Sequence, residues 1–558
     1  MEIINKEKIL KLNTYIKTNI KDKKFKYITF FWLIISTQFI IGNNLQTKGY
    51  SLKNSGDLAI NLIKIILLST LCIIINYYFL ELYNKISKKQ KTLNIQNDKF
   101  KKYRGLIYFS IIILCWIPTL LAFYPSIVSY DGGYQIRDYV FERKINLGHP
   151  IITTFLYTTF FLFGFSHFNS PTIGMLIFSI FQMILMALIF SYAVKFIEDE
   201  TGKKYLRNIS ILFYGLFPYN QLFSIMTTKD VIFAGIVVLF VINLYKILTK
   251  DDNIVEYISF IGITILMLLF RNNAVYALIV LIPVSIVLLI NNKKILKKMV
   301  CAILISIILY ESFNSIILNI VAPQGVGNND IWLCTFAQAV GKIVNEENEN
   351  LTESEKEKIS FYFTDYEKIG NAYIQYIADS TMKLIQLDNI NGNKKDFFKL
   401  MFELSKKYPR KFMDSYLNTM RGYWYVLDDS FCRIRKKTYK DKMGALELYC
   451  FPVGTDKYKI KEESKLPKLK QFYIDMFCKN EFLKIPVLRI AFQPATYFYV
   501  LIAYLLYVIY KKYKVRTIIG IYLFLYFLTC FLAPCAIIRY IYAVIVCVPL
   551  IWSFVIKD

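Results

Sequence analysis

The stretch "PIITTFLYTTFFLFGF", residues 150–165, decides how this chain is threaded through a membrane. It separates the polar segment 124–150 from another apolar run at 172–196. It is short and rich in Thr, it opens with Pro150, and a loop that begins at Gly164 closes it. Each crossing of a bilayer reverses the side of the next loop, so whether this stretch crosses determines the side of every later loop.

The composition is that of a polytopic membrane protein. Hydrophobic residues make up 55% of the 558-residue chain, and apolar runs of about 17 to 25 residues, the length needed to cross a bilayer, recur along it. Thirteen stretches are candidate spans, near residues 28–46, 58–82, 106–124, 151–168, 172–196, 209–225, 230–248, 255–270, 274–290, 299–320, 487–510, 517–533 and 540–556.

The basic loops set the threading, because Lys and Arg favour the cytoplasmic side. The clearest are the N-terminus and residues 85–104, 203–207, 293–298 and 511–516. If both 151–168 and 172–196 crossed, the basic loops 203–207 and 293–298 would lie outside and every later loop, including 511–516, would be inverted. We therefore predict that 151–168 is a re-entrant or interfacial outer helix. About 12 transmembrane helices then place both termini on the cytoplasmic side of a bacterial plasma membrane.

The charge and the cysteines exclude other classes. The net charge of +27 comes mostly from short loops, where it indicates topology and contact with anionic lipid, so no nucleic-acid partner is expected. Cys334, Cys432, Cys450 and Cys478 share one hydrophilic region without CxxC spacing. No metal site is predicted there, and disulfide pairing stays open. The chain has no Gly-rich phosphate loop, HExxH, GxSxG or internal repeat, and no cofactor is predicted.

The predicted class is an all-α polytopic membrane protein with four regions. These are a basic N-terminal region with two extra transmembrane helices (1–105), a transmembrane catalytic module (106–320), an extracytoplasmic domain (321–486) and C-terminal transmembrane helices (487–558). The third region is predicted to be mainly helical, since Thr352 and Glu355 form a capping-box pattern. For the first region a simple anchor is favoured over docking of a partner.

The threading gathers polar residues on one outer face. Ionisable groups at a membrane boundary are costly and tend to mark functional sites. The candidates are Asp131, Gln135, Arg137, His149, Lys229, Asp230, Arg271 and Arg539.

Asp131 is the favoured general base, or the group that orients the hydroxyl of an acceptor substrate. Gly132 and Gly133 follow it, and they would let the backbone bend tightly and leave the carboxylate accessible. Partial desolvation at the boundary would favour its protonated form and bring its pKa toward that of a working base. Alternatively, Asp131 only caps an outer helix through Gln135 and Arg137. Both interpretations stay open.

The other candidates also have two interpretations. Lys229 and Asp230 open an apolar span and are either catalytic or a boundary pair that reaches the interface. Arg271 and Arg539 either bind a specific phosphate or contact lipid headgroups nonspecifically. His149 either takes part in acid chemistry or ends a loop.

Together, two carboxylates and several cations at headgroup level suit a sugar carried on a lipid phosphate. The cations would stabilise the departing phosphate. Asp131 would orient and deprotonate an acceptor hydroxyl as the anomeric carbon develops positive charge.

This order of parts resembles the GT-C superfamily of multi-pass glycosyltransferases, which use polyprenyl-linked sugar donors. The resemblance lies in a first-loop acid, a Pro-opened interfacial helix and a second acid at a helix start, here "SYDGGYQ", "GHPIITTFLY" and "TTKD". It implies roles for Asp131 and Asp230, with His149 beside them. Many members have a second acid next to the first, where this chain has Gly132 and Gly133, so we expect no required divalent ion.

The stretches "FAQAVGKIVNEENENLTESEKEKI", "YPRKFMDSYLNTMRGYWY" and "APCAIIRYIYAVIVCVPLI" look like an uncharacterised family of bacterial GT-C-like proteins over roughly 106–556. The resemblance implies transfer of a sugar from a polyprenyl-phosphate donor to a cell-envelope glycan or glycolipid on the extracytoplasmic face. One alternative is a transporter or flippase for a lipid-linked saccharide, although no inverted repeat is visible. Another is a non-catalytic assembly protein.

Overall fold

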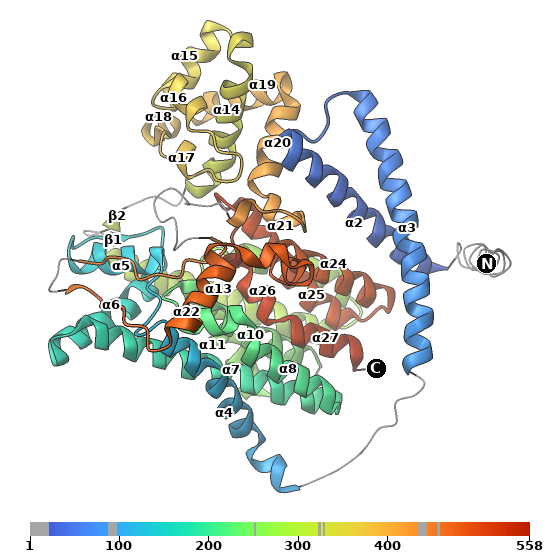
Figure 1. Cartoon of the computed structure of the whole chain (residues 1–558), viewed down its shortest axis with the longest axis vertical. Coiled ribbons are helices and arrows are strands. Elements are labelled where there is room, and N and C mark those ends of the chain that lie inside the picture. Colours follow the sequence, from blue (N-terminus) through green and yellow to red (C-terminus); the bar gives the residue numbers. More distant parts are fainter. Residues whose placement is uncertain are drawn as a thin grey trace. The chain divides into compact units, whose positions relative to one another are not determined.

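The computed structural model describes residues 22–87, 98–249, 253–321, 325–326, 330–432, 444–454 and 458–557 (Figure 1). Apart from a two-residue parallel ladder of β1 (Ile145–Asn146) with β2 (Gly325–Val326) and three isolated bridges, the regular structure within these ranges is helical. The predicted all-α class is confirmed. The N-terminus and residues 88–97, which contributed to the basic-loop argument, lie outside the described residues.

Nine helices within the described ranges are long and apolar enough to cross a membrane, so the chain is a helical membrane protein with several spans. They are Lys23–Lys48, Ser55–Tyr78, Lys102–Ala122, Ile151–Phe168, Pro171–Thr201, Lys229–Thr249, Lys293–Val321, Lys514–Leu532 and Ile538–Ile556. Three shorter apolar helices are Ile254–Phe270, Ala274–Leu289 and Pro494–Tyr510. The predicted number of about 12 crossings stays a prediction.

Helix α6 (Ile151–Phe168) has the bounds predicted from the sequence. Asn169 ends it in the left-handed conformation, with φ of 48°, and α7 (Pro171–Thr201) begins two residues later. The two helices pack closely because Gly164 and Gly174 face each other, and a Cβ on Gly164 would collide with the backbone of Gly174. α6 is one of the nine candidate spans, so its predicted interfacial position stays a prediction.

The apolar stretch near 209–225 was predicted as one continuous span, but it forms two helices. α8 (Lys204–Leu216) ends before Phe217, and α9 (Pro218–Phe223) starts at Pro218. Proline lacks an N–H group and disfavours helical backbone in the residue before it, so it is tolerated at the first position of a new helix. Asn220 donates from Nδ2 to the carbonyl of Phe213 at 2.8 Å, which satisfies an acceptor freed by the break.

The chain forms two compact units. The larger comprises residues 99–333, 429–497 and 514–558. Besides the elements already given, its helices are α4 (Asp98–Ala122), α5 (Tyr130–Val140), α10 (Lys229–Thr249), α11 (Ile254–Phe270), α12 (Ala274–Leu289), α13 (Lys293–Val321), η2 (Asp330–Leu333), η4 (Ser430–Cys432), α22 (Pro467–Tyr473), η6 (Ile474–Cys478), η7 (Glu481–Lys484), α23 (Pro486–Ala491), α25 (Lys514–Thr529), η8 (Cys530–Leu532), η9 (Ile538–Ile541), α26 (Tyr542–Val546) and α27 (Val548–Ile556).

Helix α10 is the central element of this larger unit. Of its apolar window, 89% is buried inside the protein, more than in any other candidate span of the described residues. It packs against α7, α11, α25 and α26. Its N-terminus carries Lys229 and Asp230, so two predicted site residues lie on the most enclosed helix of the unit.

The smaller unit comprises residues 1–98, 334–428 and 498–513. Its helices are α2 (Lys23–Lys48), α3 (Ser55–Ser87), α14 (Cys334–Glu347), η3 (Asn348–Asn350), α15 (Glu353–Tyr362), α16 (Tyr366–Asn371), α17 (Asp379–Met382), α18 (Leu387–Gly392), α19 (Lys394–Lys407), α20 (Pro409–Thr419), α21 (Arg421–Trp424) and most of α24 (Pro494–Tyr510). Figure 1 shows α2 and α3 as a hairpin. The loop after α2 is held by Asp414 of α20, which accepts from the hydroxyl of Ser51 at 2.5 Å.

Two predictions for the polar segment can be compared with this division. The capping box is present at the start of α15, where Thr352 and Glu355 exchange hydrogen bonds. The segment 321–486, expected as one domain, is divided, because residues 334–428 belong to the smaller unit and 429–486 to the larger. Part of the second piece packs beside α5, where the N–H of Phe451 donates to the carbonyl of Val128 at 2.8 Å.

Candidate functional site

Two loops distant in sequence lie side by side and bring the start of α5 to the start of α10. The N–H of Ile127 donates to the carbonyl of Ile225 at 3.1 Å, and the N–H of Thr227 donates to the carbonyl of Ile127 at 2.9 Å. Ser129, the residue before α5, donates from Oγ to the carbonyl of Thr227 at 2.5 Å. These contacts bring Asp131 close to Lys229, although the two residues are far apart in the sequence.

Gly132 and Gly133 make this approach possible by their lack of a side chain. Both lie inside α5 rather than in a tight bend, so the predicted bend is wrong. A Cβ on Gly132 would collide with the carbonyl oxygen and the side chain of Thr227, and a Cβ on Gly133 would lie 2.5 Å from the Phe451 side chain. The paired glycines therefore serve close packing of α5 against two neighbouring segments.

Asp131 forms an ion pair with Arg539 of η9, with 2.6 Å between Oδ2 and Nη1. It lies in the first turn of α5 and is not the N-cap, which is Ser129. Burial opposes ionisation of Asp131, but the positive charges around it, Arg539 first, hold its pKa well below the ordinary value of 3.8. The expected rise in pKa is therefore wrong, because the sequence did not reveal the guanidinium beside the carboxylate.

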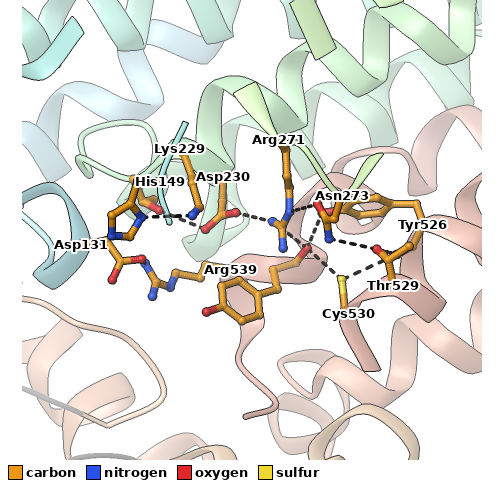
Figure 2. A network of polar contacts seen from close by, with 12 residues as sticks. Asp131, His149, Lys229, Asp230, Arg271, Asn273, Tyr526, Thr529, Cys530 and Arg539 are labelled. Atoms are coloured by element: carbon orange, nitrogen blue, oxygen red, sulfur yellow. Dashed lines mark hydrogen bonds and ion pairs between the residues drawn. The ribbon is translucent and has the colours of Figure 1, made fainter. Parts of the chain in front are cut away.

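Lys229 contacts His149, which lies between it and Asp131 (Figure 2). Nζ of Lys229 and Nδ1 of His149 are 3.2 Å apart. Burial and the charge of Lys229 lower the pKa of His149 to about 4, so the imidazole is neutral at pH 7 and its Nδ1 can accept a hydrogen bond from the ammonium group. No carboxylate of the described ranges lies within ion-pair distance of Lys229, which leaves its charge available to another anion.

Asp230 and Arg271 form the second ion pair of the site. The hydroxyl of Thr228 also donates to Asp230, at 3.1 Å. Arg271 donates from Nε to Asn273 at 3.0 Å, and Asn273 in turn donates to Thr529 at 3.1 Å. The rings of Phe233, Tyr526 and Tyr540 surround the guanidinium, with centroids 5.1 to 5.6 Å from its central carbon. Arg271 is therefore a fixed cation with defined partners.

A cavity of about 420 Å³ opens at this network. Its lining consists of Gly148, Pro150, Lys229, Arg271, Asn272, Asn273, Tyr276, Ile331, Trp332, Thr529, Cys530, Leu532, Ala533, Pro534 and Tyr540. The charged side chains of this lining are Lys229 and Arg271, both cations. Asp131, His149, Asp230 and Arg539 are not part of this lining, although His149 contacts Lys229 and Asp230 is paired with Arg271. The cavity suits an anionic group attached to an apolar or aromatic-binding one.

Gln135 and Arg137, predicted to bind substrate, are not part of this network. Gln135 donates from Nε2 to the hydroxyls of Thr153 and Thr154, at 2.9 and 3.1 Å, and so ties α5 to α6. Arg137 pairs with its neighbour Asp138 at 3.1 Å and has its guanidinium over a ring of α5. The side-chain contacts of Gln135 are with α6 and those of Arg137 are within and just after α5, so their predicted binding of substrate stays a prediction.

Four residues of the site were not identified from the sequence. Glu447 accepts from the N–H of Tyr130 at 3.1 Å, at the start of α5. The hydroxyl of Tyr157 is buried without a hydrogen-bond partner in the described structure, within electrostatic range of both aspartates. Asn273 holds Arg271. The fourth is Gln182, a buried amide in the apolar run of α7, and only for Gln182 did the sequence carry a signal, since a polar side chain inside a span needs partners.

Gln182 organises the loop that precedes α10. Its Nε2 lies 3.0 to 3.1 Å from three carbonyl oxygens, those of Phe223, Ser224 and Met226. These carbonyls belong to the irregular segment between α9 and Lys229. A single side chain thus fixes the backbone that carries the cavity's lysine.

Metal ligands and thiols are the remaining groups to consider for this site. Within the ranges that the structure describes, no group of three His, Cys, Asp or Glu side chains is arranged to hold a metal ion. All ten cysteines have free thiols. One of these thiols, that of Cys530, lines the cavity together with Lys229 and Arg271.

Comparison with known proteins places the chain in a family. The model of a family of unknown function (DUF6020) matches residues 142–557. The match includes every residue of the network except Asp131, which precedes it. The chain matches no curated protein and no solved structure. Because the match covers more than half of the sequence, the chain belongs to the family of unknown function DUF6020.

Proposed function

We propose that the protein is a glycosyltransferase of the bacterial plasma membrane. It would transfer a sugar from a polyprenyl-phosphate donor to a cell-envelope glycan or glycolipid on the extracytoplasmic face. The observation that carries the proposal is a cavity of about 420 Å³ lined by two cations, Lys229 and Arg271. Of the two carboxylates of the network, Asp230 pairs with Arg271 and Asp131 pairs with Arg539. The resemblance to the GT-C superfamily supports the same conclusion.

The donor phosphate is assigned to the cationic side of the cavity. Lys229 has only His149 as a side-chain partner in the described structure, so an entering phosphate gains its full attraction without breaking an ion pair. Arg271 is already oriented by Asp230 and Asn273 and adds a second positive charge at a fixed position. Preorganised cations of this kind stabilise negative charge that grows on a leaving phosphate.

The acceptor hydroxyl is assigned to Asp131. In the reaction, the acceptor oxygen forms a bond to the anomeric carbon, the bond from that carbon to the phosphate oxygen breaks, and polyprenyl phosphate leaves with the electron pair. The hydroxyl proton passes to the Asp131 carboxylate. Because Arg539 makes this carboxylate a weak base, proton transfer follows bond formation, when the acceptor oxygen has become acidic.

The liposome assay tests this proposal. Purified protein is reconstituted with a radiolabelled polyprenyl-phosphate sugar and an envelope fraction as acceptor, and label in the acceptor is counted. Transfer by the natural protein and its loss in Asp131→Asn support the proposal. Transfer at an unchanged rate by folded Asp131→Asn would overturn the role of this carboxylate.

The same liposomes separate enzyme from carrier. Label that crosses the bilayer with its chemistry unchanged identifies a flippase for a lipid-linked saccharide, and binding without either event identifies a non-catalytic protein. Mass analysis of envelope glycans from cells with and without the gene then identifies the sugar, since one substituent should be missing.

A further inference from the structure

A second cavity, of about 440 Å³, lies in the smaller unit at one end of three helices. It is bounded by the start of α2, the later part of α3 and the end of α24. The lining residues are Lys24, Tyr27, Ile28, Phe31, Trp32, Asn76, Ala503, Leu506, Tyr507, Tyr510 and Lys511. Because α2 and α3 are candidate membrane spans, this cavity borders on lipid.

The charged residues of the lining are both lysines, Lys24 and Lys511. Lys24 and Lys511 are exposed, and the lining that the structure describes includes no carboxylate. Nζ of Lys511 lies 5.9 Å from the centroid of the Tyr510 ring, which packs edge to face against Tyr27 at 5.9 Å. The aromatic pair keeps one lysine above the opening, so two ammonium groups flank the place where a headgroup would lie.

Deeper in the cavity the lining is apolar, with two polar donors. Ile28, Phe31 and Leu506 provide the apolar wall. Nε1 of Trp32 is buried and has no hydrogen-bond acceptor among the described residues. Asn76 of α3 adds an amide. A buried N–H group is costly when it lacks an acceptor, so a ligand with an oxygen at this depth would be stabilised.

We propose that this cavity binds an anionic glycerophospholipid of the surrounding bilayer. The phosphate lies between Lys24 and Lys511, the ester carbonyls accept from Trp32 and Asn76, and an acyl chain contacts the apolar wall. Polyprenyl phosphate is also an anion but has no ester carbonyl, so the two donors favour the glycerophospholipid. The site is independent of the proposed glycosyltransferase activity.

Tryptophan quenching by brominated lipid tests the proposal. The full-length protein is reconstituted in vesicles with brominated phosphatidylglycerol or, for comparison, brominated phosphatidylcholine. Because the chain has five tryptophans, only the part of the quenching that is lost in Trp32→Phe reports on this cavity. We expect the anionic lipid to quench Trp32 preferentially. Each lysine removed should lower that preference about fivefold, so Lys24→Gln with Lys511→Gln should abolish it.

The matched control is Lys26→Gln with Lys512→Gln. These lysines lie beside Lys24 and Lys511 in sequence and remove equal charge, but they do not line the cavity. The control should keep the preference. Equal quenching by both lipids, or equal losses in the two double variants, would overturn the proposal. Displacement of phosphatidylglycerol by an equimolar amount of polyprenyl phosphate would do so too. None of these outcomes affects the sugar-transfer assay.

Discussion

Asp131 and Arg539 form an ion pair in which Oδ2 and Nη1 are 2.6 Å apart, although one begins α5 and the other lies near the C-terminus. Their side chains are 17% and 10% exposed. In such a position each charge depends on the other, because removal of one partner leaves the other desolvated and uncompensated. The pair therefore joins α5 to η9 in an energetic sense as well as a spatial one.

The pair should show strong energetic coupling. Asp131→Asn and Arg539→Gln should each lower the free energy of unfolding by about 3 kcal/mol or more, whereas the double variant should lose less than the sum of the two. Thermal unfolding of the purified protein in detergent measures all four forms. The exposed pair Lys144 with Glu142, 3.6 Å apart, is the control and should show coupling of about 1 kcal/mol or less. Additive losses at Asp131 and Arg539 would contradict the buried pair.

Stability should fall in mild acid because of His149. Its pKa falls from an ordinary 6.5 to about 4 in the folded protein, so between these values the unfolded chain binds a proton that the folded chain does not. The contribution of His149 is thus complete above pH 6.5, declines as the pH falls toward 4 and amounts to roughly 3 kcal/mol. The contribution of Asp131, whose folded pKa is also lowered, declines only below its ordinary 3.8.

Unfolding temperature measured from pH 7 to pH 4 checks this. His149→Gln should flatten the decline, and His167→Gln should leave it unchanged, since His167 is the other histidine of the chain and is exposed. Identical pH profiles for the natural protein and His149→Gln would show that the imidazole is not held neutral.

Gly132→Ala should disturb the site through packing alone. The added methyl group would collide with Thr227, at a cost of about 1 to 3 kcal/mol, and would move α5 away from Lys229. Gly262→Ala is the matched control, because Gly262 is also helical and a Cβ there meets nothing within 4 Å. That change should be neutral or stabilise by up to about 1 kcal/mol. Unfolding and sugar transfer are measured on both, and equal behaviour would refute the close approach.

Lys229 and Arg137 should differ sharply in function. Lys229→Gln removes the cation of the cavity that lacks a carboxylate partner in the described structure, and transfer should fall about 100-fold or more. Arg137→Gln removes an equal charge from outside the network and should change transfer by less than roughly twofold. Initial rates in the liposome assay distinguish them. Similar losses in the two variants would mean that overall charge, not the cavity, governs activity.

The sequence predicted elements that depend on local rules. The bounds of α6 follow from Pro150 and the loop after Phe168, and the capping box of α15 follows from two residues three positions apart. It did not predict the break at Pro218, because an apolar stretch of suitable length outweighed a single proline. Local patterns predict helix ends well, but they do not show which of two competing signals determines the structure.

The site was predictable in membership more than in arrangement. Asp131, Asp230, Arg271 and Arg539 were chosen because they are ionisable at apolar boundaries, and the structure brings them together. Which acid pairs with which arginine depends on contacts between distant segments, and a single sequence does not encode these in any local pattern. For this reason the predicted direction of the Asp131 pKa shift was wrong.

The three carbonyls held by Gln182 have a consequence for how the chain tolerates an irregular segment in its interior, where residues 224–228 are buried. A buried peptide group has no water to bond with, so a buried turn is stable only when another group takes the place of solvent. One amide does this here. The bend before α10 thereby becomes as permanent a part of the scaffold as a helix, and ligands would meet a surface already shaped for them.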